Sequence, residues 1–163
     1  IQFGHNDQKK DSPERYADPW GDYQKNLEKF VNVARNKEAN PLLITPLARR
    51  IFIDKFHLDH KTHGDYPAAI LDLGKKLNVP VIDLFSLSIE FLEKKGKEAT
   101  KKYFLHLQAG EYLSTQNDLR DNTHLRGDGA VAFANIIAIE LKKLGGIYKE
   151  ILHLPEELNG IVC

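Results

Sequence analysis

The sequence has 163 residues, enough for one domain with a hydrophobic core, and its 23 basic and 23 acidic residues give a formal net charge of zero. Balanced charge argues against nucleic acid as a partner, and no apolar run approaches the length of a membrane span. The single cysteine, Cys163, permits no internal disulfide, so cysteine usage leaves the localisation undecided.

The chain begins with the pattern of a buried strand. Ile1-Gln2-Phe3 followed by Gly4 predicts the end of a core strand that runs into a turn. The sequence contains no methionine. We therefore expect these residues to be a piece of a larger domain whose N-terminal strands lie before Ile1, with a processed mature chain as the alternative.

Predicted helices and strands alternate along the rest of the chain, with Asp22 as a candidate N-cap of the first helix and Asn78 as a C-terminal stop of the second. The helices are expected over 23–34, 66–77, 87–104 with a break at Gly96, and 129–144, and the strands over 42–45 and 79–84. This alternation predicts a single α/β domain with a parallel sheet covered by helices on both faces. Residues 145–163 are expected to form a C-terminal appendage.

Ligands of such sheets bind at the carboxyl ends of the strands. The turn from Gly4 to Asp7 and the Arg49-Arg50 pair follow predicted strands, and the segment from Asp121 to His124 precedes the last helix and can reach the same edge. Asp121 can reach one imidazole nitrogen of His124 and leave the other free for proton transfer. A solvated loop with local turn hydrogen bonds is the alternative interpretation of this pair.

Short blocks of sequence resemble a known family. Gly4-His5-Asn6-Asp7 and Asp121-Asn122-Thr123-His124 resemble the Gly-x-Asn-Asp and Asp-x-x-His blocks of the SGNH (GDSL-type) hydrolases. Three further stretches, over 2–7, 45–52 and 63–67, are similar to the rhamnogalacturonan acetylesterase branch of that family. The resemblance implies a three-layer α/β/α sandwich with a flavodoxin-like sheet. It also implies hydrolysis of acetyl esters on pectic polysaccharide, without a cofactor.

The resemblance assigns a role to each matching residue. His124 would be the general base, Asp121 its orienting carboxylate, and Asn6 a side-chain donor to the oxyanion, with Gly4 allowing close approach of the backbone. A turn-capping role is the alternative for Asn6. Asp7 is expected to make a local structural hydrogen bond.

The family's Gly-Asp-Ser nucleophile block and its oxyanion-glycine block have no counterpart in these residues. Ser12 lies in a polar loop, and Ser86 and Ser88 are expected near the start of a helix, so none is assigned as nucleophile. We expect both blocks to lie before Ile1, and this chain alone to be inactive.

Other polar residues leave two interpretations open. Arg49 and Arg50 are candidates for binding the carboxylates of an acidic polysaccharide, with a salt bridge to a neighbouring loop as the alternative. Histidines recur at positions 57, 60 and 63, but we expect a solvated loop rather than a metal site. Arg126 stands where relatives often have a helix-capping serine, and Asp128 is a possible replacement cap.

The leading hypothesis is a serine acetylesterase acting on an acetylated carbohydrate. A non-catalytic carbohydrate-binding or interaction module of the same fold is the first alternative. An esterase or lipase acting on another acyl ester is the second, and the lack of a long apolar lid disfavours lipids.

Overall fold

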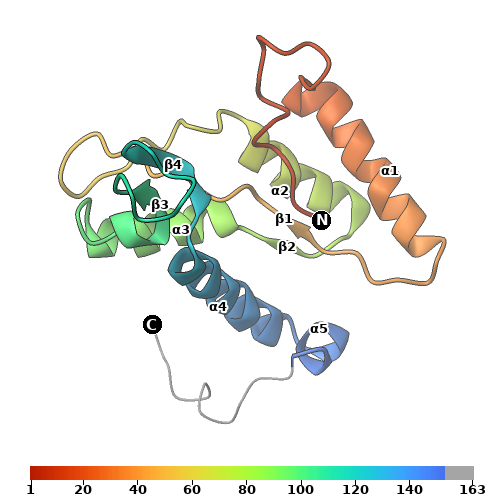
Figure 1. The fold of residues 1–163 in the computed structure, drawn as a ribbon. Helices are drawn as coiled ribbons and strands as arrows, with labels where there is room; N and C mark the ends of the chain where they lie inside the picture. The colour runs from red at the N-terminus through yellow and green to blue at the C-terminus, as the bar shows by residue number, and fades with distance from the viewer. Residues whose placement is uncertain (153–163) are drawn as a thin grey trace.

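The computed structural model describes residues 1–152, which form a mixed α/β arrangement (Figure 1). The helices are α1 (Gln24–Arg35), α2 (Tyr66–Leu77), α3 (Leu84–Lys95), α4 (Gly127–Leu144) and α5 (Gly146–Glu150), with a π-helical turn η1 (Pro19–Tyr23) and a 3₁₀ turn η2 (Lys101–Tyr103). The strands are β1 (Leu43–Ile44), β2 (Val81–Ile82), β3 (Phe104–Leu107) and β4 (Leu119–Leu125).

Three of the predicted strand segments lie side by side in parallel. β1 and β2 pair with Leu43 opposite Val81 and Ile44 opposite Ile82, and Gln2 forms a parallel bridge with Ile44. Their carboxyl ends therefore face the same edge, as expected. Within the described residues the parallel part consists of these short pieces, so the complete sandwich expected from the sequence is not present there.

Helices pack against both faces of the short parallel strands. Leu43 belongs to a buried cluster with Val31 of α1 and Ile70 of α2, whereas Ile82 belongs to a second cluster with Leu92 of α3 and Phe133 of α4. Alternating strand residues point to opposite faces, which explains the two clusters. Figure 1 shows α1 and α2 on one side of the strands and α4 on the other.

The helix ends follow local chemistry, with some shifts from the predictions. Asp18 rather than Asp22 provides the first cap, because its side chain accepts from the backbone N–H of Trp20 and the helical turn begins at Pro19. Asn78 ends α2 in the left-handed conformation (φ 51°), as predicted. Asp83 caps α3 through the N–H of Ser86.

The apolar spacing of residues 129–144 predicts a well-buried helix with Ala130, Phe133, Ala134, Ile137, Leu141 and Leu144 on one face. The observed α4 is less buried than this prediction. Of the residues of α4, only Gly129, Phe133 and Ile136 are buried, and Ala134 is exposed. The buried stripe is therefore rotated toward Ile136 and away from the predicted face.

A β-hairpin replaces part of a predicted helix. The helix predicted over 87–104 starts earlier, at Leu84, and ends before Gly96 (φ 81°). Phe104 then begins β3, which pairs antiparallel with β4. The segment from Asp121 to His124, expected in a loop, consequently lies on a strand.

The C-terminal part returns toward the middle of the chain. The Tyr148 hydroxyl donates to the carbonyl of Pro41 (3.1 Å), which attaches α5 to the segment before β1. The remainder of the predicted appendage, Cys163 included, lies outside the described residues. Between residues 1 and 152, no helix combines the length and the apolar character needed to cross a membrane.

Candidate active site

Asp121 and His124 form a hydrogen-bonded pair at the surface. His124 Nδ1 lies 2.6 Å from Asp121 Oδ2, and Asp121 Oδ1 accepts from the backbone N–H groups of Thr123 (2.7 Å) and His124 (2.9 Å). The His124 side chain is 73% exposed, and within residues 1–152 its Nε2 has no hydrogen-bond partner. The free Nε2 is therefore available to accept a proton.

The Asp121 carboxylate is stabilised in its charged form. Partial burial raises the pKa of this carboxyl, but hydrogen bonds from the His124 N–H, the His124 ring and the Thr123 N–H lower it by more, so the net pKa is below the ordinary value. Asp121 therefore stays negatively charged at neutral pH, which orients the Nδ1–H of His124 and favours the imidazolium that proton transfer would create.

The same local geometry occurs a second time in the chain. His57 Nδ1 lies 2.7 Å from Asp54 Oδ2, and Asp54 Oδ1 accepts from the His57 backbone N–H (2.8 Å). An Asp-x-x-His turn thus forms this pair by itself. The surroundings of Asp121 and His124 distinguish them from Asp54 and His57.

One such feature is a bulge in the β3–β4 hairpin. His106 pairs with Arg120 and Phe104 pairs with Leu125, so residues 121–124 of β4 lie opposite residue 105 of β3. A bulge of this kind displaces side chains from the regular ladder, and bulges are common beside functional sites. The displaced segment is attached to the core where the Arg50 N–H donates to the carbonyl of Asn122 (2.8 Å).

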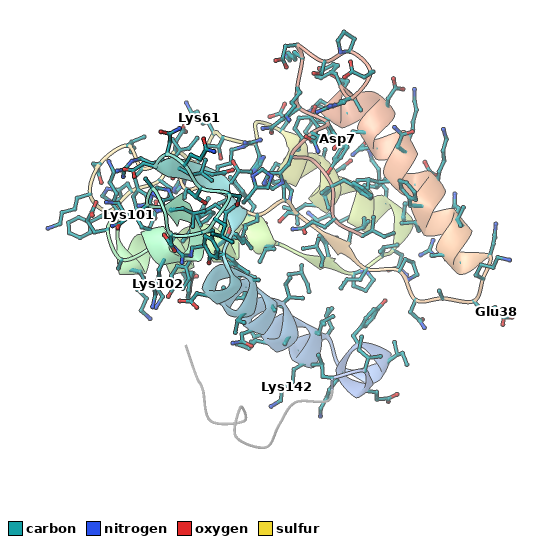
Figure 2. The ribbon with its side chains drawn as sticks, in the orientation of Figure 1. Asp7, Glu38, Lys61, Lys101, Lys102 and Lys142 are labelled. Carbon is teal, nitrogen blue, oxygen red and sulfur yellow. The ribbon has the colours of Figure 1, made fainter. Side chains whose placement is uncertain are left out.

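The turn from Gly4 to Asp7 follows the N-terminal strand segment (Figure 2). Gly4 is buried at φ 127°, and a Cβ there would lie 3.2 Å from the Tyr23 hydroxyl, so this position requires glycine. The Gly4 N–H donates to Asp7 Oδ2 (3.0 Å), which confirms the local structural bond expected of Asp7. Asn6 is exposed, and among the described residues its side-chain amide has no partner.

Arg49 connects this turn to the Asp121–His124 segment. Its Nη1 donates to Thr123 Oγ1 (3.1 Å) and its Nη2 to the carbonyl of His5 (3.3 Å). Thr123 precedes His124 and His5 precedes Asn6, so one guanidinium joins the two stretches that the resemblance assigns to the site. Substrate binding by Arg49 stays a prediction. In this structure both Nη atoms of Arg49 donate to protein groups.

Arg50 is a structural residue in this fold. It is 4% exposed, and its guanidinium donates to Thr100 Oγ1 (2.9 Å), to Asn122 Oδ1 (3.0 Å) and to the carbonyl of Lys97. This burial does not fit the prediction that Arg50 binds a polysaccharide, and the bonds to neutral acceptors of neighbouring loops are not the salt bridge given as the alternative. Burial removes the side chain from any ligand in solution.

His5 was not singled out by the sequence, yet it lies beside the site. Its ring packs edge-on against the ring of His63, with centroids 4.5 Å apart. Burial is the largest of the effects that lower the pKa of His5 to about 4; the charges of Arg49 and His124 act in the same direction, and a hydrogen bond with the Leu47 backbone opposes them. His5 is therefore neutral near pH 7 and does not compete with His124 for a proton.

The histidines of the 57–63 loop have separate partners. His57 pairs with Asp54, His60 Nε2 lies 2.8 Å from Glu93 Oε1, and His63 is buried with Nε2 2.8 Å from the carbonyl of Leu47. The three rings do not converge, and residues 1–152 contain no group of three or more side chains placed to hold a metal ion.

The serines considered as nucleophiles hydrogen-bond to groups other than His124 or lie in a different loop. Ser86 Oγ donates to Asp83 Oδ2 (2.6 Å) near the start of α3, and the fully buried Ser88 accepts from the Ala48 N–H (3.0 Å). Ser12 lies in the turn before η1, where its carbonyl accepts from Arg15 N–H. None of these serines, nor any other in the described chain, hydrogen-bonds to His124.

Arg126 has a structural role at the start of α4. It donates to the carbonyl of His106 (3.1 Å) and pairs with Glu111 Oε1 (2.5 Å), which attaches the β3–β4 loop to the helix start. The cap proposed for Asp128 does not form, because the residue lies inside the first turn and the helix has no side-chain cap.

Comparison with known proteins identifies relatives over most of the chain. It is 38% identical over 145 residues to "Rhamnogalacturonan acetylesterase RhgT" of Bacillus subtilis (strain 168), covering 89% of this chain and 60% of that protein. It is 35% identical over 149 residues to "Probable rhamnogalacturonan acetylesterase YesY" of the same organism, covering 89% of this chain and 62% of the relative. The chain thus spans about three fifths of the length of these relatives. The resemblance predicted from the sequence blocks is confirmed.

The fold also has a counterpart among solved structures. The crystal structure of the Bacillus subtilis protein YXIM aligns with a TM-score of 0.64 and 24% sequence identity, over 90% of this chain and 36% of that one. At this identity the similarity concerns the fold alone. No family model matches the chain.

Proposed function

Because the chain is homologous to rhamnogalacturonan acetylesterases over most of its length, we propose that it forms part of a serine esterase that removes acetyl groups from a pectic polysaccharide. One observation carries the proposal: the Asp121–His124 pair is joined through Arg49 to the turn that presents Asn6. Asp54 and His57 form the same pair, but neither hydrogen-bonds to that turn.

The proposed reaction has two stages. His124 Nε2 takes the proton from a serine hydroxyl as the serine oxygen bonds to the acetyl carbon, and Asp121 stabilises the imidazolium. The side-chain amide of Asn6 donates to the oxyanion, and the imidazolium returns its proton to the departing sugar oxygen. His124 then removes a proton from water as the water oxygen attacks the acetyl-serine, and it returns this proton to the serine oxygen as that oxygen leaves, which releases acetic acid and the free serine.

The nucleophile is proposed to lie outside these 163 residues. The serines of the described chain do not bond to His124, and the relatives extend well beyond the matched region. The same argument supports the finer fold proposal, in which further strands complete a three-layer, flavodoxin-like sandwich around β1 and β2. The substrate is proposed to be acetylated rhamnogalacturonan, as the name of the first relative implies.

Substitution of His124 tests this proposal. In the longer polypeptide that carries the serine, His124→Ala is expected to lower aryl-acetate turnover by roughly 10³-fold or more, because the general base is lost. His57→Ala removes the matched histidine of the second Asp-x-x-His pair and is expected to leave turnover unchanged. Undiminished hydrolysis by His124→Ala would refute the mechanism.

The 163-residue chain by itself is expected to show no turnover of the same aryl acetate. Hydrolysis by the purified chain that survives a serine-directed inhibitor would contradict the placement of the nucleophile.

A non-catalytic carbohydrate-binding module of the same fold is the second candidate. It is favoured by the absence of a serine bonded to His124 in the described residues. An inactive full-length protein that still binds the polysaccharide, with no effect of His124→Ala on binding, would support this candidate over the esterase.

A further inference from the structure

An open cavity of about 520 Å³ lies between the loop that precedes α1 and the start of α2. Its walls include Gln8, Lys10, Tyr16, Trp20, His63 and Asp65. In Figure 1 the two contributing segments, the loop leading to α1 and the start of α2, lie next to each other. The volume lies in the range of small-molecule sites, and the open, partly polar lining with its aromatic rings is suited to a polar ligand.

Trp20 is held in place while much of its surface stays exposed. Its indole N–H donates to Asp65 Oδ2 (3.1 Å) and its backbone N–H to Asp18 Oδ1 (3.1 Å), and the residue is 50% exposed. The polar edge of the ring is thus satisfied by the protein. A fixed aromatic face toward an open cavity is suited to stacking against the C–H groups of a sugar ring.

The charges of the cavity favour a neutral ligand. Asp18 and Asp65 contribute two carboxylates, and Lys10 contributes one ammonium whose Nζ lies 6.0 Å from the Tyr16 ring centre. Two negative charges against one positive charge disfavour an acidic sugar. The carboxylates and the Lys10 ammonium together offer acceptors and donors for the hydroxyl groups of a neutral sugar, whereas both ends of the Gln8 amide are bonded to Thr62 and His63.

The cavity adjoins the candidate active site. Gln8 lies in its wall two residues after Asn6, and Gln8 Oε1 is 3.0 Å from His63 Nδ1. The His63 ring in turn packs against His5, whose carbonyl is bonded to Arg49. A sugar chain whose ester lies at Asn6 and His124 could therefore extend into this cavity.

We propose that this cavity is a binding subsite for a neutral pyranose residue of the polysaccharide, stacked on Trp20. Its connection to ester cleavage rests on the proposed function, but binding in the cavity does not require hydrolysis. The subsite lies beside the candidate catalytic residues, and Trp20 is a binding residue rather than a catalytic one.

The position of Trp20 provides a direct measurement, because it is the only tryptophan of the chain. Methyl rhamnoside, methyl galactoside and galacturonate are each titrated into the 163-residue chain while its tryptophan emission is recorded. At least one neutral glycoside is expected to cause a saturable change at roughly millimolar concentration, with galacturonate at least about tenfold weaker. No saturable change with either neutral glycoside, or tighter binding of galacturonate, would overturn the proposal.

Two substitutions distinguish the loss of sugar stacking on Trp20 from a general effect on the fold. Trp20→Ala is expected to weaken binding by at least about tenfold in calorimetric titration, since the stacking surface is lost. Phe56→Ala removes an aromatic residue that is similarly exposed (54%) and outside the cavity wall, and it should leave binding unchanged. Equal effects of the two substitutions would refute the role of Trp20.

Failure of this proposal can be distinguished from failure of the proposed function. If the longer polypeptide hydrolyses aryl acetate and the 163-residue chain binds neither neutral glycoside, the proposed esterase function stands and the proposed subsite is refuted. Glycoside binding that depends on Trp20, together with no hydrolysis of aryl acetate by the longer polypeptide, would support the subsite and refute the esterase.

Discussion

Arg49 is the residue on which the alignment of the candidate site depends. Its guanidinium is partly buried, its Nη atoms bond to Thr123 and His5, and its Nε is buried without a partner. Burial lowers the pKa of Arg49, while the nearby Asp121 charge raises it. The Arg49 guanidinium therefore holds the segment that contains His124 at a fixed distance from the turn that contains Asn6.

Substitution of Arg49 distinguishes positioning from substrate binding. Arg49→Met is expected to lower kcat by roughly 10- to 100-fold on a neutral aryl acetate and on the acidic polymer alike, because misplacing catalytic groups costs rate whatever the substrate. Turnover of both substrates is measured in the longer polypeptide. A loss confined to the acidic polymer would restore the sequence-based prediction that Arg49 binds carboxylates. Arg35→Met, which loses bonds to the carbonyls of Leu77 and Asn78 at the end of α2, serves as the control.

At the scale of elements, α4 is positioned by a close approach to η2. A Cβ on Gly129 would lie 2.0 Å from the carbonyl oxygen of Tyr103, and the same oxygen accepts from the Arg126 N–H (3.0 Å). The helix that follows His124 thus packs directly on the backbone that begins β3. Only glycine permits this contact, since backbone atoms cannot move aside as a flexible side chain can.

Gly129→Ala is therefore expected to destabilise the protein. The clash should outweigh the helix propensity gained and lower the free energy of unfolding by about 2 kcal/mol. Gly127→Ala, in the same helix but with no atom within 4 Å of its Cβ, should change stability by between zero and about 1 kcal/mol in the favourable direction. Urea denaturation measures both, and a neutral Gly129→Ala would contradict the packing.

The whole molecule is expected to lose stability in mild acid through its buried histidines. The pKa of His63 is lowered from 6.5 to about 4, chiefly by burial and also by the neighbouring His5, against the opposing effect of the hydrogen bond to Leu47. Between pH 6.5 and 4 the unfolded chain binds a proton at His63 that the folded chain rejects. The stability contributed by this residue is thus complete above pH 6.5. It falls by up to roughly 3 kcal/mol as the pH drops through that window.

Replacing single histidines tests this dependence. His63→Gln should flatten the fall in unfolding free energy between pH 6.5 and 4. His57→Gln should leave the fall in this window unchanged, because the hydrogen bond to Asp54 raises the pKa of His57, and the stability this adds is complete below pH 6.5 and is lost only as the pH rises above it. An unchanged slope in His63→Gln would contradict the prediction.

Local patterns in the sequence predicted much of this molecule. Apolar spacing placed α2 and its stop at Asn78, and short blocks located the Gly4–Asp7 turn and the Asp121–His124 pair. The β3–β4 hairpin was missed because Tyr103 and Phe104 continue an apolar pattern compatible with a helix, and the alternation from Phe104 to Leu107 is brief. The run Phe104-Leu105-His106-Leu107 before the turn residue Gly110 was the available signal.

Contacts between distant residues could not be predicted in the same way. The bonds of Arg49 to Thr123 and of Arg50 to Asn122 join positions 74 and 72 residues apart, and adjacent arginines look equivalent in the sequence. The cavity at Trp20 likewise depends on two loops whose approach no periodicity encodes. A lone tryptophan in a polar loop was the only indication.

The turn that joins Asp121 to His124 has a consequence for how activity would be lost. Its hydrogen bonds span two or three residues, whereas the alignment of His124 with Asn6 spans the whole domain. Local contacts close at little entropic cost and survive partial opening, and distant ones do not. Heating or denaturant should therefore separate the base from its oxyanion donor while the Asp–His pair is still intact, so that inactivation precedes any change at the pair itself.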